Sequence, residues 1–192
     1  MKKAFILIGL LSVIILAKDL KAPVRIDPTI QSFDGLFSQK LSVKFFVGEI
    51  LDKRANAPTD TLGMTRTGRN IFAPIVTKLL PSSLLKNSIA GMLREVSAYS
   101  EDRAKAKYVI EGEVLFCDFI ETSKVFSQEI RAIVKFRIKI RNAATDELVK
   151  QFVIASENER TAFDTTPFAE KVMTNALISG MVNILQDISM YQ

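Results

Sequence analysis

The fold is decided by residues 130–141, which read IRAIVKFRIKIR. Apolar side chains alternate with mostly basic ones, and a period of two is the pattern of a β-strand with one buried face and one solvated face. This is the longest alternating run in the chain. We therefore expect it to be a long strand of a sheet, and the other elements are placed around it.

Three further segments complete the predicted sheet. Residues 108–117 alternate in the same way, residues 142–147 supply a turn, and residues 148–154 form the hairpin partner. An earlier strand is predicted from Leu41 to Val47. In the 108–117 strand, one face is expected to carry Tyr108, Ile110, Gly112, Val114 and Phe116, and the other Val109, Glu111, Glu113, Leu115 and Cys117.

Two amphipathic helices are expected. The first begins with Ser82 or Ser83 as its cap, and Gly91 within it would allow close packing on a sheet. The second begins at Thr166-Pro167, with proline in the first turn. Their apolar stripes are Leu85, Ile89, Met92, Leu93 and Val96 in the first, and Phe168, Val172, Leu177, Met181, Ile184, Leu185 and Ile188 in the second.

The predicted fold class is α+β: a two-layer sandwich with a mainly antiparallel sheet, two helices on one face and the order β-α-β-β-β-α. The stretch from Ala55 to Pro81 contains several glycines and prolines and is expected to be irregular. Three segments follow: residues 1–17 as a signal peptide, residues 18–40 as an extended lead-in with a short strand at 24–26, and residues 41–192 as a single domain.

The N-terminus predicts export. Lys2 and Lys3 precede an uncharged apolar run, residues 4–17, as in a secretory signal peptide. A helix of that length spans about 21 Å, short of the ~30 Å hydrocarbon core. Residues 15–23 contain no cysteine for lipid attachment. We expect a periplasmic or envelope protein that is soluble after cleavage, or tethered by the uncleaved run.

The composition argues against catalysis. The chain has 192 residues, no histidine, no tryptophan and one cysteine, so the commonest general base is missing and a zinc cage or a Cys–His pair is excluded. The expected formal net charge is +5, and two of these charges lie in the signal segment. We expect no enzymatic activity, no metal and no cofactor. A third class of function is a hydrolase with a carboxylate pair such as Asp52 with Glu49, which nothing in the spacing favours.

Two motifs support a family resemblance. Residues 47–54, VGEILDKR, followed by 62–68, LGMTRTG, resemble the start of the YajG-type envelope lipoproteins, and residues 110–114, IEGEV, resemble a later strand of that family. The resemblance covers residues 41–190 and implies no enzymatic activity. Auxiliary lipoproteins of ABC-type lipid transporters and lipoprotein activators of cell-wall synthases have similar element orders, and the lipidation cysteine of all three groups is absent here.

The candidate contact surface is basic. Side chains opposite the apolar face of the 130–141 strand form a ribbon that could meet phosphates of anionic lipid or lipopolysaccharide. It lacks the interleaved aromatic residues of a nucleic-acid site, so no nucleic acid is expected. The alternative, which the sequence favours, is a solvated face balanced by Glu111, Glu113 and Glu157. The candidate residues are Arg66, in a loop with two glycines, and Arg131, Lys135, Arg137, Lys139 and Arg141 in the ribbon.

Other candidates have simpler interpretations. Asp52 and Arg54 are expected to pair with each other, and Cys117 to be a buried thiol, with an intermolecular disulfide as the alternative. Residues 63–70 lack the lysine and hydroxyl of a phosphate-binding loop. The sequence thus predicts a non-enzymatic binding or scaffold module with an envelope protein partner. The alternative is an accessory subunit of a lipid or outer-membrane transport system, which needs an apolar groove between helix and sheet.

Overall fold

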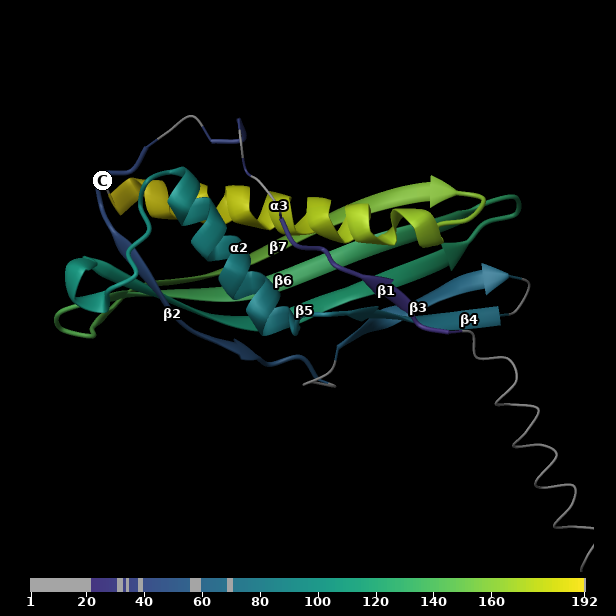
Figure 1. Cartoon of the computed structure of the whole chain (residues 1–192), viewed down its shortest axis with the longest axis horizontal. Helices are drawn as coiled ribbons and strands as arrows, with labels where there is room; N and C mark the ends of the chain where they lie inside the picture. The colour runs from purple at the N-terminus through teal and green to yellow at the C-terminus, as the bar shows by residue number, and fades with distance from the viewer. Residues whose placement is uncertain are drawn as a thin grey trace, which may run out of the picture.

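The computed structural model describes residues 22–30, 33, 35–37, 40–55, 60–68 and 71–191, without the side chains of residues 66–68, 71 and 72. The predicted signal segment, residues 1–17, lies outside the described residues. The described chain is an α+β protein with two α-helices and two sheets (Figure 1). None of its described helices is both long enough and apolar enough to span a bilayer.

The larger sheet has four strands in the order β2-β5-β6-β7. These are β2 (Phe45–Asp52), β5 (Tyr108–Ser123), β6 (Gln128–Asn142) and β7 (Leu148–Ala162). β5, β6 and β7 are antiparallel, as predicted, whereas β2 runs parallel to β5. The alternation in β6 is confirmed, because every second side chain from Ile130 to Ile140 is at most 1% exposed.

A second sheet lies where the sequence predicted an irregular stretch. β3 (Thr61–Gly68) and β4 (Ile71–Thr77) form an antiparallel hairpin, and β1 (Val24–Ile26) pairs parallel with β4. The prediction for this stretch was wrong because Gly63, Gly68 and Pro74 are residue types typical of loops, yet they lie within β3 and β4. Pro74 is tolerated because β1 starts pairing only at Ile75, so the proline lies beyond that ladder. The observed order is therefore β1-β2-β3-β4-α2-β5-β6-β7-α3.

Both helices pack against one side of the larger sheet (Figure 1). α2 (Pro81–Glu95) contacts β2 and β5, and α3 (Ala169–Ile188) contacts β6, β7 and α2. Their apolar stripes enter one core with the inner faces of the strands. The predicted cap of α2 was wrong, since Leu80 is the N-cap, makes no side-chain capping bond and is followed by Pro81 in the first turn.

The residues before β2 contribute to this core. Phe33, Phe37 and Leu41 are buried in it. A Cβ atom on Gly91 of α2 would lie 3.0 Å from Cε2 of Phe33. Gly91 therefore makes room for the aromatic ring of Phe33 from the lead-in. The prediction that Gly91 allows close packing on a sheet was wrong.

A β-bulge in β5 reverses the predicted faces of its second half. Val114 pairs with Phe136 and Phe116 with Lys135, so Leu115 is the extra residue. Beyond the bulge the inward positions are taken by Cys117 and Phe119, while Phe116 turns to the opposite side and is 37% exposed. The prediction that Phe116 shares the buried face of Ile110 was wrong, because alternation alone does not show an inserted residue.

Candidate binding surface

The face of the larger sheet opposite the helices carries the predicted basic ribbon. β6 contributes the basic side chains, and acidic residues of β5 and β7 lie beside them in register. Arg137 and Lys139 both donate to the carboxylate of Glu113, at 2.5 and 2.9 Å, and Arg141 Nε donates to Glu111 at 2.9 Å. The two donors lower the pKa of Glu113, with the hydrogen bond from Lys139 as the largest cause.

Arg131 is surrounded by three carboxylates. It donates to Glu129 at 3.2 Å and forms ion pairs with Glu157 and Glu159 at 3.9 and 3.3 Å. The structure therefore brings Glu111, Glu113 and Glu157 to the ribbon, as the balanced-face interpretation expected. Cross-strand pairs of opposite charge stabilise a sheet locally. They also leave less uncompensated charge for a phosphate ligand.

Lys135 differs from the other four members of the ribbon. It is exposed and has no ion-pair partner among the described residues. Its neighbours across the sheet are Phe116 on β5 and Ala155 on β7. The sixth candidate, Arg66, has a described backbone in β3, but its side chain lies outside the described part of the structure.

Apolar side chains interrupt the charges on this face. Phe116, Ile120 and Val153 are 37%, 48% and 48% exposed. Ile120 stands opposite Arg131, and Val153 opposite Arg137. The sequence did not single out these three residues. The bulge hid the orientation of Phe116, and an isolated apolar residue on an exposed strand face carries no signal of its own.

The Asp52–Arg54 pair marks the point where β5 changes its neighbour from β2 to β3. Arg54 donates to both carboxylate oxygens of Asp52, and the two side chains are only 9% and 6% exposed. Arg54 Nη1 also donates to the carbonyls of Thr61 on β3 and Cys117 on β5, both at 3.3 Å. The expected pairing is confirmed. The arginine joins the two sheets and neutralises Asp52, which therefore forms no acidic pocket with the exposed Glu49.

Close packing continues beside this pair. Gly63 has a φ of +94°, and a Cβ atom there would lie 2.5 Å from Oδ1 of Asp118 and 2.9 Å from the carbonyl oxygen of Phe119. Glycine is thus required by the backbone conformation and by the approach of β3 to β5. Partial burial raises the pKa of Asp118, although its carboxylate accepts a hydrogen bond from the Phe119 N–H at 2.8 Å.

Cys117 is a buried thiol, as expected. It is 1% exposed, and burial raises its pKa to about 12. The thiolate is the species that attacks disulfides and binds metals. In the folded protein Cys117 is neither ionised nor accessible, so the structure gives no support to the alternative of an intermolecular disulfide.

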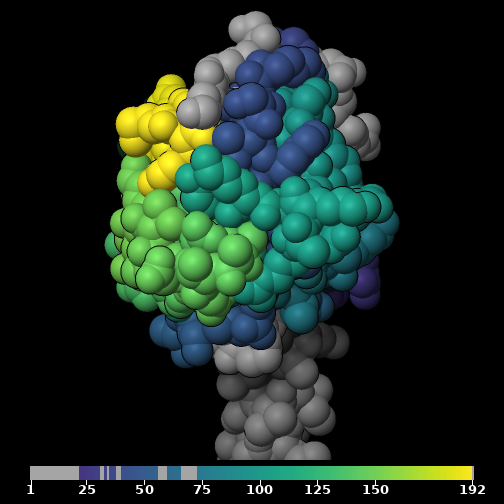
Figure 2. All heavy atoms as spheres, turned by 90° about the vertical axis from the view of Figure 1, so that its left-hand side faces the viewer, coloured from purple at the N-terminus to yellow at the C-terminus, as the bar shows by residue number. Residues whose placement is uncertain are grey.

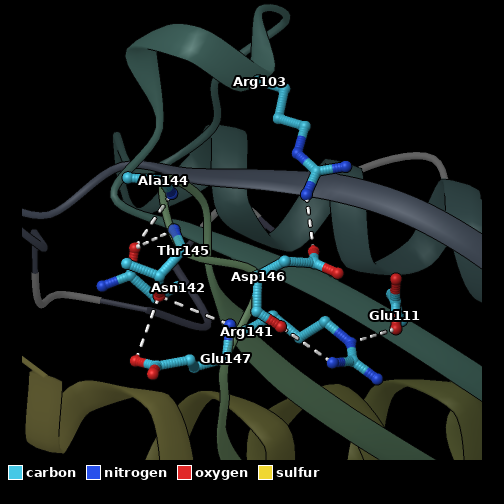
Figure 3. Close-up of polar contacts among 8 residues, drawn as sticks. All are labelled: Arg103, Glu111, Arg141, Asn142, Ala144, Thr145, Asp146 and Glu147. Carbon is cyan, nitrogen blue, oxygen red and sulfur yellow. Dashed lines mark hydrogen bonds and ion pairs between the residues drawn. The ribbon is translucent and has the colours of Figure 1, made fainter.

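The turn between β6 and β7 closes one end of this face (Figure 3). The side-chain oxygen of Asn142 accepts hydrogen bonds from the backbone of Ala144 and Thr145 at 2.9 and 3.3 Å. Asp146 accepts from Arg103 through its carboxylate at 2.6 Å and from Arg141 through its carbonyl at 2.9 Å. Arg141 therefore connects the turn to Glu111 of β5.

The helix side of the molecule carries a small hollow of about 250 Å³ between β7 and the start of α3. Five of its seven lining residues are polar or charged, and the amides of Asn158 and Asn175 meet across it at 3.5 Å. The Arg160 guanidinium lies 4.8 Å from the ring centroid of Phe168. The lining residues are Asn158, Glu159, Arg160, Phe168, Lys171, Val172 and Asn175.

Comparison with known proteins identifies the class of fold. Protein XCC0632 from Xanthomonas campestris, described as a DUF330 protein, is similar with a TM-score of 0.61 and 11% sequence identity, covering 89% of this chain and 95% of that one. At this identity the likeness establishes the fold alone. No protein-family model matches the chain, and no curated protein matches it in sequence.

Two bacterial lipoproteins are also similar, at lower scores. The minor lipoprotein from Acinetobacter baumannii has a TM-score of 0.43 and 8% identity, covering 74% of this chain and 93% of that one. Lipoprotein GNA1162 from Neisseria meningitidis has a TM-score of 0.40 and 7% identity, covering 76% and 99%. These scores are too low to carry an argument, and the YajG-type resemblance stays a prediction.

Proposed function

We propose that this chain is an exported, non-enzymatic protein of the cell envelope that binds a protein partner through the helix-free face of its larger sheet. The observation that carries the proposal is the exposure of Phe116, Ile120 and Val153 among charges that are already paired. Export rests on the basic start and apolar run of residues 1–17.

The chemistry of the face suits a protein better than a phosphate. A protein interface combines apolar contacts with a polar surround, and this face offers both. Four of the five ribbon cations are occupied by carboxylates. Lys135, beside Phe116, remains for an acidic group of the partner.

The proposal is tested by cross-linking cells that produce the C-terminally tagged protein and quantifying what co-purifies. The test variant carries Phe116→Ser, Ile120→Thr and Val153→Thr, which keeps β-forming residues at two of the three positions. The control carries Leu36→Ser and Met190→Ser, which are 47% and 70% exposed and lie outside the larger sheet.

We expect a defined envelope protein to co-purify with the wild type and the control but not with the test variant. Equal recovery by all three proteins would contradict the proposal. Lipids are analysed in the same eluates. Stoichiometric phospholipid or lipopolysaccharide without a protein partner would favour the alternative, an accessory subunit of a lipid or outer-membrane transport system.

A further inference from the structure

Three apolar side chains project almost fully into solvent. Val125 and Phe126 lie in the connection between β5 and β6, and Phe163 directly follows β7; they are 87%, 89% and 88% exposed. Each exceeds the exposure of any apolar residue on the sheet face described above. We call these three residues the apolar tip.

Strand register places the apolar tip at one end of the molecule. The β5–β6 connection is tight, since Lys124 N–H donates to the Ser127 carbonyl at 2.8 Å. Gln128, the first residue of β6, pairs with Ala162, the last residue of β7. Phe163 therefore leaves the sheet beside Ser127. Figure 1 shows the β5–β6 connection and the end of β7 together at the right-hand end.

The N-terminal part of the described chain lies at the same end. The Asp27 N–H donates to the Glu170 carboxylate in the first turn of α3 at 2.9 Å, and α3 begins shortly after Phe163.

The size of the apolar tip favours a bilayer over a protein. The two aromatic side chains bury roughly 150–250 Å² each and Val125 less, so the three together bury less than the ~800 Å² that one partner contributes to a typical stable interface. Phenylalanine side chains on a protruding connection can instead enter the headgroup boundary of a membrane, as apolar residues of peripheral proteins do.

Basic and acidic side chains both lie near the apolar tip. Glu159 is paired with Arg131, and Asp164 accepts from the Thr166 N–H. Arg160 and Lys171 line the hollow between β7 and α3 and are exposed. Neither has an ion-pair partner among the described residues. Cations beside inserted apolar side chains favour an anionic lipid surface.

From these observations we infer that the apolar tip inserts into the surface of a phospholipid bilayer, with Arg160 and Lys171 facing anionic headgroups. The molecule would then stand on the membrane by this end, and the β6–β7 turn would point away from it. This inference does not rest on the proposed protein partner, and the two can fail separately.

The absence of tryptophan from the chain allows a direct test. The variants Phe126→Trp and Phe163→Trp each place a single fluorophore at the apolar tip, and Leu148→Trp places one at the opposite end, at a position that is 52% exposed in the wild type. The full-length variants are reconstituted into vesicles of phosphatidylcholine and phosphatidylglycerol, with or without bromine on the acyl chains. Circular dichroism checks that each is folded.

We expect a blue shift of the emission and a loss of intensity with brominated lipid at positions 126 and 163, and neither at 148. Equal quenching at all three positions would overturn the inference. A blue shift that grows with protein concentration but ignores bromine would also overturn it, because it would assign the apolar tip to a contact with a second copy.

The charges are tested in the Phe126→Trp background. Adding Arg160→Gln and Lys171→Gln should abolish the increase in quenching that phosphatidylglycerol produces in the parent. The control carries Lys53→Gln and Lys86→Gln, exposed lysines elsewhere that change the net charge equally. A dependence on phosphatidylglycerol that is lost equally in both double variants would contradict the role of Arg160 and Lys171.

Discussion

The two ends of the larger sheet are built in different ways. At the β6–β7 turn, the Ala143 N–H donates to the Lys107 carbonyl, and Tyr191 near the C-terminus packs edge-on against Tyr108. Figure 2 shows this end as a closed surface in which the turn, the segment between α2 and β5 and the C-terminal residues lie against one another.

The end with the apolar tip contains several buried polar groups without a partner. Within the described residues, buried side-chain oxygens of Thr65, Gln128, Thr165 and Thr166 have no hydrogen-bond partner. Buried polar groups are nearly always paired in native proteins. Both ends expose apolar side chains, but those of the apolar tip are nearly fully exposed, at 87–89%, against 52% for Leu148 at the turn end.

The largest expected effect concerns the Asp52–Arg54 pair, which joins the two sheets. Arg54→Ala leaves the carboxylate of Asp52 buried without its counter-charge, and the free energy of unfolding should fall by about 3–5 kcal/mol. The measurement is urea unfolding at neutral pH. The control is Lys78→Ala, whose pair with Asp27 is exposed and should contribute at most about 1 kcal/mol. A similar small loss for both variants would show that Arg54 does not hold the sheets together.

A smaller effect compares how much a side chain at each end contributes to stability. Asn142→Ala removes the acceptor of two backbone N–H groups in the turn and should cost about 1 kcal/mol. Asn142→Asp keeps an acceptor oxygen and should cost less. Phe126→Ser at the apolar tip removes a side chain without packing partners and should change stability by less than about 0.5 kcal/mol. A larger loss from Phe126→Ser than from Asn142→Ala would reverse the comparison.

The sequence predicted the turn end better than the other end. Alternation in β6 and a polar turn at 142–147 are local patterns, and the acidic partners of Arg137 and Arg141 followed from strand adjacency. The bulge at Leu115 and the β3–β4 hairpin were missed because one depends on an inserted residue and the other contains glycine and proline. Val125, Phe126 and Phe163 gave no signal, since their exposure depends on tertiary structure.

A comparably small effect concerns the charged face on the turn side, through Glu113. Its carboxylate has a pKa below the ordinary value of 4.5 because Lys139 and Arg137 donate to it. A group with a lowered folded pKa stabilises the protein above its ordinary pKa, and this contribution is lost as the pH falls through the folded value. The two cationic side chains are 27% and 37% exposed, so at neutral pH Glu113→Gln should cost no more than about 1 kcal/mol.

This stability difference between wild type and Glu113→Gln should shrink as the pH falls below 4.5 and vanish at lower pH. Urea unfolding at a series of pH values measures it. The same substitution is made in an Arg137→Gln, Lys139→Gln background, where the difference should not depend on pH in this range. A pH-dependent difference that persists without the two cations would assign it to another cause, and the charged face would then not be stabilised by these cross-strand pairs.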